Sequence, residues 1–132
     1  MRLVIDASVV VQVAIAGGNL GPLRGHELIA PPVLRSEALS SISELTFRGE
    51  IPPDAARETM LRIAAIDIEL DRPADMDERA WDLARQLGWA KTYDAEYLVL
   101  SIIRDAPLVT LDERLRRGAA RLVQAIAPID LG

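Results

Sequence analysis

Short apolar runs alternate along the chain with longer segments in which apolar residues recur every three or four positions. The short runs have the aliphatic character of buried strands and lie at 3–5, 26–30, 66–70, 108–111 and 122–126. The longer segments have helical spacing and lie at 8–16, 33–48, 52–64, 76–87 and 94–104, with a short arginine-rich helix after Asp112. Strands that alternate with helices predict one α/β domain over 1–132, with a central parallel sheet flanked by helices.

Three details of this pattern are specific enough to test. The helix over 94–104 is apolar nearly all round, so we expect it to be buried. The helix over 52–64 carries a predicted apolar face of Ala56, Met60, Ile63 and Ala64. Four of the eight glycines lie in 17–25, which predicts an irregular loop.

Composition and charge narrow the functional classes. The formal net charge is −5, from 15 Lys and Arg against 20 Asp and Glu, which does not suit nucleic-acid binding through bulk electrostatics. The chain has no cysteine, so it holds neither disulfides nor thiolate metal sites. We see no apolar run of membrane-spanning length and no signal-peptide pattern, and we expect a cytoplasmic protein without a membrane segment.

Four acidic residues fall at positions that this fold would bring together. Asp6 ends the first strand and Asp112 ends the fourth strand. Glu37 lies in the opening turn of the helix that follows the second strand. The helix that begins at Asp94 is about 16 Å long, and the next strand returns over about the same distance, so Asp94 and Asp112 finish side by side. Ligands of open α/β sheets bind at the carboxyl ends of the strands, so we expect the four carboxylates to form one acidic site.

Crowded carboxylates favour a cation, because like charges raise one another's pKa values unless they are compensated. A cluster with only oxygen ligands suits Mg²⁺ or Mn²⁺. Such an ion lowers the pKa of a bound water and stabilises charge on a phosphodiester during in-line displacement. The pattern therefore predicts a metal-dependent site for phosphodiester chemistry.

Four segments then resemble a known family. In order they are VIDAS, PPVLRSEALSSISEL, KTYDAEYLVLSI and LVTLDERL. Together they resemble the PIN-domain ribonucleases, particularly the VapC-type toxins of bacterial and archaeal toxin–antitoxin pairs. The resemblance implies a central parallel sheet and a Mg²⁺-dependent endoribonuclease, with Mn²⁺ as a possible substitute. It also implies an RNA substrate, a cognate small antitoxin protein as inhibitor, and a homodimer.

The resemblance also assigns roles to residues. The family's acidic positions match Asp6, Glu37, Asp94 and Asp112. Asp6, Asp94 and Asp112 are expected to hold the metal, and Glu37 to help ligate it or to orient the attacking water. Thr110 matches a hydroxyl residue that often precedes the last acid, and with Ser8 it is expected to support the site. The chain departs from the family in the short glycine-rich segment before Glu37 and in lacking an asparagine around Ser40 and Ser41.

Each feature also has an ordinary structural interpretation. Asp6 and Asp94 suit helix caps, Glu37 suits a helix dipole, and Asp112 suits a solvated helix start. The sole histidine, His26, suits a surface position. The charges near the site are Lys91, Arg114, Arg116, Arg117 and Arg121, which either contact RNA phosphates or solvate a helix face, and Trp81 and Trp89 suit packing or partner contacts.

Other functions remain open at this point. They are a PIN-like nuclease that processes RNA without an antitoxin, a metal-binding or RNA-binding module without catalysis, and a phosphoacceptor receiver domain. A receiver domain wants paired acids after its first strand, whereas here Asp6 is followed by Ala7.

Overall fold

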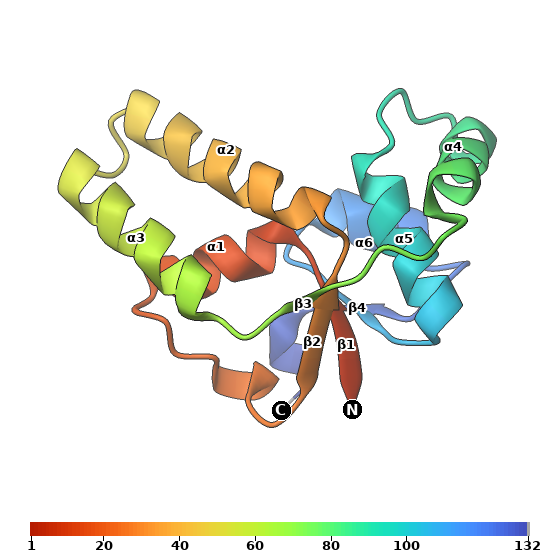
Figure 1. Cartoon of the computed structure of the whole chain (residues 1–132), viewed down its shortest axis with the longest axis horizontal. Helices are drawn as coiled ribbons and strands as arrows, with labels where there is room; N and C mark the ends of the chain where they lie inside the picture. Colours follow the sequence, from red (N-terminus) through yellow and green to blue (C-terminus); the bar gives the residue numbers. More distant parts are fainter. Residues whose placement is uncertain (132) are drawn as a thin grey trace.

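A five-stranded parallel sheet forms the centre of the computed structural model, which describes residues 1–131 (Figure 1). The strands lie side by side in the order β3-β2-β1-β4-β5. Their bounds are β1 Arg2–Ile5, β2 Glu27–Ala30, β3 Glu69–Leu70, β4 Leu108–Val109 and β5 Ala125–Ile126. All four pairings are parallel, and the predicted α/β fold is confirmed.

Six α-helices accompany the sheet in the described residues, and five of them form two groups beside the strands. Their bounds are α1 Ala7–Ile15, α2 Val33–Phe47, α3 Pro53–Ala65, α4 Met76–Leu87, α5 Tyr93–Arg104 and α6 Glu113–Ala119. In Figure 1, α1, α2 and α3 lie to the left of the strands, and α4 and α5 lie to the right. Two short 3₁₀ turns, Gly21–Leu23 and Pro128–Leu131, complete the elements, so the predicted loop over 17–25 contains one ordered turn.

Three strands are shorter than the apolar runs predicted. The runs 66–70, 108–111 and 122–126 supply only two ladder residues each. A strand extends only as far as its neighbour offers backbone partners. Beyond the ladder, Leu111 and Leu122 are 43% and 40% exposed, so these ends of the apolar runs do not lie in the core. The centre of the sheet agrees with the sequence, because Leu3, Val4 and Ile5 are almost fully buried.

Two predictions about helix faces are wrong in part. The middle of α5, from Tyr97 to Ser101, is buried, but Tyr93 at its start is 46% exposed and Ile102 near its end is 37% exposed. On α3, Ala56 is buried as predicted, whereas Ala64 is exposed and Thr59 takes the place expected for Met60. Thr59 is tolerated there because its hydroxyl donates to the carbonyl oxygen of Ala55 at 2.7 Å, which leaves no unpaired polar group in the core.

The direction in which the chain adds strands to the sheet reverses at β1. The chain runs outward from β1 through β2 to β3, then crosses over through α4 and α5 to β4 on the other side of β1. Such a switch point leaves a crevice at the carboxyl ends of the strands, where open α/β sheets bind ligands. This order, 3-2-1-4-5, differs from the 2-1-3-4-5 order of receiver domains, so the topology argues against that alternative. No helix within residues 1–131 has both the length and the apolar character needed to cross a bilayer.

Candidate active site

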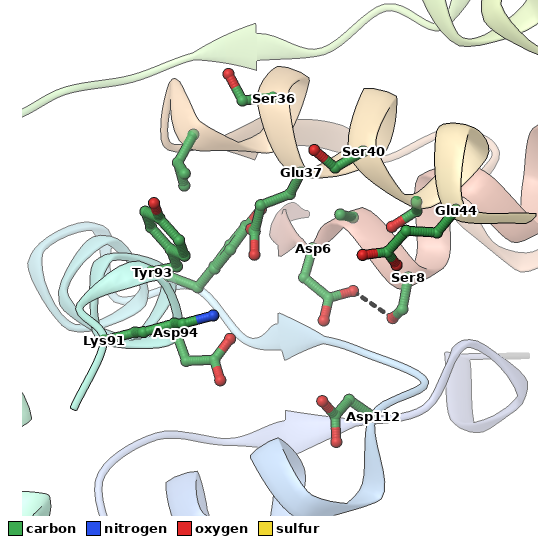
Figure 2. A pocket seen from close by; sticks show the side chains of 14 residues that line it. Asp6, Ser8, Ser36, Glu37, Ser40, Glu44, Lys91, Tyr93, Asp94 and Asp112 are labelled. Carbon is green, nitrogen blue, oxygen red and sulfur yellow. Dashed lines mark hydrogen bonds between the residues drawn. The ribbon is translucent and has the colours of Figure 1, made fainter. Parts of the chain in front are cut away.

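The four predicted acids line one cavity of about 600 Å³ at the switch point (Figure 2). Asp6 comes from the end of β1, Glu37 from α2, Asp94 from α5, and Asp112 from the loop after β4. The fold therefore brings together side chains that are far apart in the sequence. Their catalytic and metal-binding roles stay predictions.

Asp6 is held firmly by the start of α1. It is the N-cap residue of that helix, and the residue as a whole is only 5% exposed. Its Oδ1 accepts from the Ser8 hydroxyl at 2.6 Å and from the Val9 amide at 3.3 Å, and its Oδ2 accepts from the Thr110 hydroxyl. Burial raises the pKa of Asp6, although these donors oppose the rise, and the nearby Asp112 charge raises the pKa further. The helix-cap interpretation and the site interpretation thus both apply to this residue.

Ser8 and Thr110 also tie the end of β1 to the loop after β4. The Ser8 hydroxyl accepts from the Leu111 amide at 3.0 Å, and the Thr110 hydroxyl accepts from the Asp112 amide at 3.0 Å. Asp112 in turn caps α6, because its Oδ1 accepts from the Leu115 amide at 3.1 Å. The two hydroxyl groups therefore fix the separation of Asp6 and Asp112.

Glu37 lies just past the opening turn in which it was expected. It is the fifth residue of α2, because the helix begins at Val33, directly after two prolines. Its Oε1 accepts from the hydroxyl of Tyr97 at 2.7 Å, and Tyr97 is almost completely buried in α5. Burial raises the pKa of Glu37, the Tyr97 hydrogen bond lowers it, and the charges of Asp94 and Asp6 raise it again.

Asp94 is the least restrained of the four acids. It is the second residue of α5, whose N-cap is Thr92, so it is a first-turn acid and not the cap itself. Burial raises the pKa of Asp94, the charge of Asp112 adds to the rise, and Arg114 opposes it. The Arg114 contact is long, with Nη2 at 3.9 Å from Oδ2, and the Arg114 side chain is 83% exposed.

The sequence interpretation missed a polar stripe on α2. Ser36, Ser40, Ser41 and Glu44 line the cavity together with Glu37. Spacings of three, four and seven residues place side chains on one helix face, so this stripe was visible in the sequence. Tyr97 was also missed, since its role depends on how α5 packs against α2.

The remaining candidate residues differ in whether they line the cavity. Lys91 lines the acidic cavity, whereas Arg116 pairs with Glu113 at 3.6 Å. His26 lies outside the cavity, and its buried Nδ1 has no hydrogen-bond partner among the described residues. Trp89 is half-buried, and Trp81 is exposed under the Arg85 guanidinium, 4.6 Å from the ring centroid.

The cavity's donor chemistry fits a hard divalent cation held partly through water. Carboxylate oxygens face it from several sides, and among the described lining residues Lys91 is the one cation. Within residues 1–131, no three acidic or histidine side chains form a group that could hold a metal ion as they stand. Mg²⁺ commonly keeps several waters and takes only one or two carboxylates directly. The negative charge of Asp112 raises the pKa of both Asp6 and Asp94, so the three carboxylates are close enough to share one hydrated ion.

Comparisons with known proteins agree on the fold. A model of the PIN domain matches residues 3–121, and a search of curated proteins finds no match. PAE2754 from Pyrobaculum aerophilum is 19% identical, with 99% of this chain and 96% of that chain covered and a TM-score of 0.72. VapBC2 from Rickettsia felis, solved bound to a DNA fragment from its promoter, is 15% identical, with 96% and 98% covered and a TM-score of 0.64. At these identities the structural likeness concerns the fold alone.

Proposed function

This chain belongs to the PIN-domain family, and on that premise we propose that it is a Mg²⁺-dependent endoribonuclease that hydrolyses RNA phosphodiester bonds at the acidic cavity. The observation that carries the proposal is the gathering of Asp6, Glu37, Asp94 and Asp112 around one crevice at the switch point of the sheet. Burial raises the pKa of three of these acids, so their ionised forms gain from a bound cation.

Three of the acids are the proposed metal ligands, and the other residues orient them or the water. Asp6, Asp94 and Asp112 would hold Mg²⁺, or Mn²⁺ in its place. When bound, the ion would supply Lewis-acid stabilisation of the phosphodiester and a water of lowered pKa. Glu37 helps to ligate the ion or orients the attacking water, with its carboxylate held by Tyr97. Ser8 and Thr110 keep the Asp6 carboxylate aimed into the cavity.

We further propose that the enzyme is the toxin of a toxin–antitoxin pair, acting as a homodimer in the cytoplasm and inhibited by a small antitoxin. This part rests on the resemblance of the four sequence segments to VapC-type toxins. The alternative is a PIN-like nuclease that processes RNA without an antitoxin. A short reading frame directly upstream whose product binds this chain and relieves its toxicity on co-expression supports the toxin role, and growth unaffected by induced expression contradicts it.

Cleavage of RNA by the purified protein tests the catalytic proposal. We expect cleavage in Mg²⁺ or Mn²⁺ and none in EDTA. Asp94→Asn should lower the rate by about 100-fold or more, the size expected for removing one group that stabilises transition-state charge. Asp67→Asn, an exposed acid outside the cavity, is the matched control and should cleave normally. Cleavage that persists in EDTA, or that survives Asp94→Asn, contradicts the mechanism.

A further inference from the structure

A second cavity of about 580 Å³ adjoins the acidic one. It lies between the α4–α5 loop and α6, and it shares two lining residues, Lys91 and Asp94, with the first cavity. In Figure 2 the Lys91 side chain lies beside Asp94 at one side of the acidic cavity. The volume falls within the range of about 300–1,000 Å³ that is typical of ligand sites.

The two cavities differ in charge. The acidic cavity is lined by five carboxylates, those of Asp6, Glu37, Glu44, Asp94 and Asp112, against one lysine. The second cavity is lined by two cations, Lys91 and Arg114, against one carboxylate, Asp94. An RNA strand carries one negative charge per nucleotide, so the acidic cavity repels it except where a metal ion compensates. The second cavity is therefore the favourable place for the phosphates that flank the cleaved bond.

Specific backbone and side-chain contacts order the wall of the second cavity. Gly88 ends α4 in the left-handed conformation, with φ at +73°. The Trp89 amide then donates to the carbonyl oxygen of Ala84 at 2.8 Å, and Arg85 Nη2 donates to the carbonyl oxygen of Trp89 at 2.7 Å. These bonds hold the backbone of Trp89, whose indole lies against Gly118 of α6.

Gly118 supplies the space beside that indole. A Cβ atom at Gly118 would lie 3.1 Å from Cζ2 of Trp89, which is closer than ordinary van der Waals contact. Glycine is otherwise unfavourable within a helix by about 0.5–1 kcal/mol relative to alanine. The position therefore gives up helix stability for close approach at the cavity wall.

We propose that this second cavity binds the nucleotide next to the cleaved phosphodiester of a single-stranded RNA. Lys91 and Arg114 contact the flanking phosphates, and Trp89 forms the apolar wall that faces the base. A base is free to enter such a cavity only when it is unstacked and unpaired, which selects single-stranded RNA over duplex. This proposal rests on the proposed nuclease function and adds a binding site for its substrate.

Tryptophan fluorescence tests the proposal directly. The chain has two tryptophans, so Trp81→Phe leaves Trp89 as the sole tryptophan, which is excited selectively at the red edge of its absorption. This variant is combined with Asp112→Asn to block cleavage and titrated with a 5′-labelled single-stranded oligoribonucleotide. We expect RNA binding, followed by anisotropy of the label, to change the Trp89 emission with the same midpoint.

Charge and space variants add a second readout. Lys91→Glu should weaken RNA binding about tenfold or more and reduce the slope of log affinity against log salt by about one. Gly118→Ala should weaken binding several-fold while the protein melts normally, because the added methyl crowds Trp89. Arg24→Glu makes the same charge change outside both cavities and should bind as the parent does.

The outcomes separate the two proposals. RNA that binds or is cleaved without any change in Trp89 emission, and equally well with Lys91→Glu, overturns the nucleotide site and leaves the nuclease function standing. Failure of all forms, the parent included, to bind or cleave RNA overturns the nuclease function and the site with it. Equal affinity for duplex and single-stranded RNA overturns the selection of unpaired bases.

Discussion

Asp6 and Asp71 each follow directly after a parallel strand, yet they lie in opposite electrostatic environments. Asp71, after β3, accepts two hydrogen bonds from the Arg104 guanidinium, at 2.7 and 2.9 Å, which lower its pKa. Asp6, after β1, is bonded only to hydroxyl and amide groups, and burial raises its pKa. Position at the end of a strand therefore does not distinguish a structural acid from a candidate catalytic one. Between these two acids, the difference lies in the close guanidinium beside Asp71.

The two acids also make opposite contributions to stability as pH changes. A carboxyl group with a raised folded-state pKa stabilises the protein below its unfolded pKa, and this stabilisation is lost as pH rises through the folded value. A group with a lowered pKa, such as Asp71, stabilises the protein above its unfolded pKa and loses that effect as pH falls. A metal ion in the acidic cavity would supply there what Arg104 supplies to Asp71.

The largest effect is expected from placing a permanent positive charge in the acidic cavity, as Arg104 provides for Asp71. Ser40 lines the cavity from α2, near Glu37, and is exposed. Ser40→Arg should lower Mg²⁺-dependent cleavage by about 100-fold or more, since a guanidinium competes with the ion for the carboxylates and removes charge stabilisation from the reaction. The same variant should melt higher than the parent in EDTA. Cleavage rates and thermal melts measure both effects.

Ser43→Arg is the matched control for that change. Ser43 is on the same helix but lines the groove between α2 and α3, away from the acids. It should leave cleavage unchanged. Normal activity in the Ser40→Arg variant would show that the cavity tolerates a permanent cation, and it would contradict the proposed metal site.

Removing a hydroxyl donor from Asp6 gives the next largest effect. Thr110 is fully buried, donates to Asp6 and accepts from the Asp112 amide. Thr110→Val should reduce activity by about 10–100-fold, the usual size for a residue that orients a metal ligand, and destabilise the fold by about 1–3 kcal/mol. It should also move the acidic limb of the rate profile to higher pH, because Asp6 loses a bond that lowers its pKa.

A control for that variant exists on α2. The Thr46 hydroxyl donates to the carbonyl oxygen of Ile42 within the same helix, at 2.9 Å. Thr46→Val should leave the pH profile of cleavage in place. A Thr110→Val enzyme with an unshifted profile would indicate that the hydroxyl serves packing alone.

Metal removal tests the stability side of the comparison. In EDTA, the raised pKa values of Asp6, Glu37 and Asp94 should make the melting temperature fall as pH rises above the ordinary values of 3.8 for Asp and 4.5 for Glu. Mg²⁺ at about 100 times its dissociation constant should restore about 2.7 kcal/mol at neutral pH. Calorimetry over a pH series, with and without the ion, measures this. A melting temperature insensitive to Mg²⁺ at every pH speaks against binding.

The smallest effect is expected at the compensated acid. Arg104→Met leaves Asp71 without its guanidinium partner and should lower the melting temperature at neutral pH. The difference from the parent should shrink as pH falls through the lowered pKa of Asp71, since the protonated acid gains nothing from Arg104. RNA cleavage should be unaffected. A large loss of cleavage would mean that this ion pair also positions the active site.

Sequence patterns predicted the central strands, the helices and the convergence of the acids, because each depends on local spacing and on the rules of parallel sheets. The lengths of the three short strands were not predictable, since each depends on the backbone partners that the neighbouring strands offer. The Glu37–Tyr97 hydrogen bond joins residues that are 60 positions apart and depends on how two helices pack. Asp6 and Asp71 look alike in the sequence, and only the arrangement of Arg104 in space separates them.

The hydroxyl bridge at the end of β1 makes the site depend on two distant parts of the chain. Asp6 and its partner Thr110 are 104 positions apart, and Thr110 lies close to Asp112. A nascent or truncated chain that lacks this late segment has neither the last acid nor the donor that aims the first one. Packing of these two distant parts of the chain against each other is therefore a condition for the proposed activity.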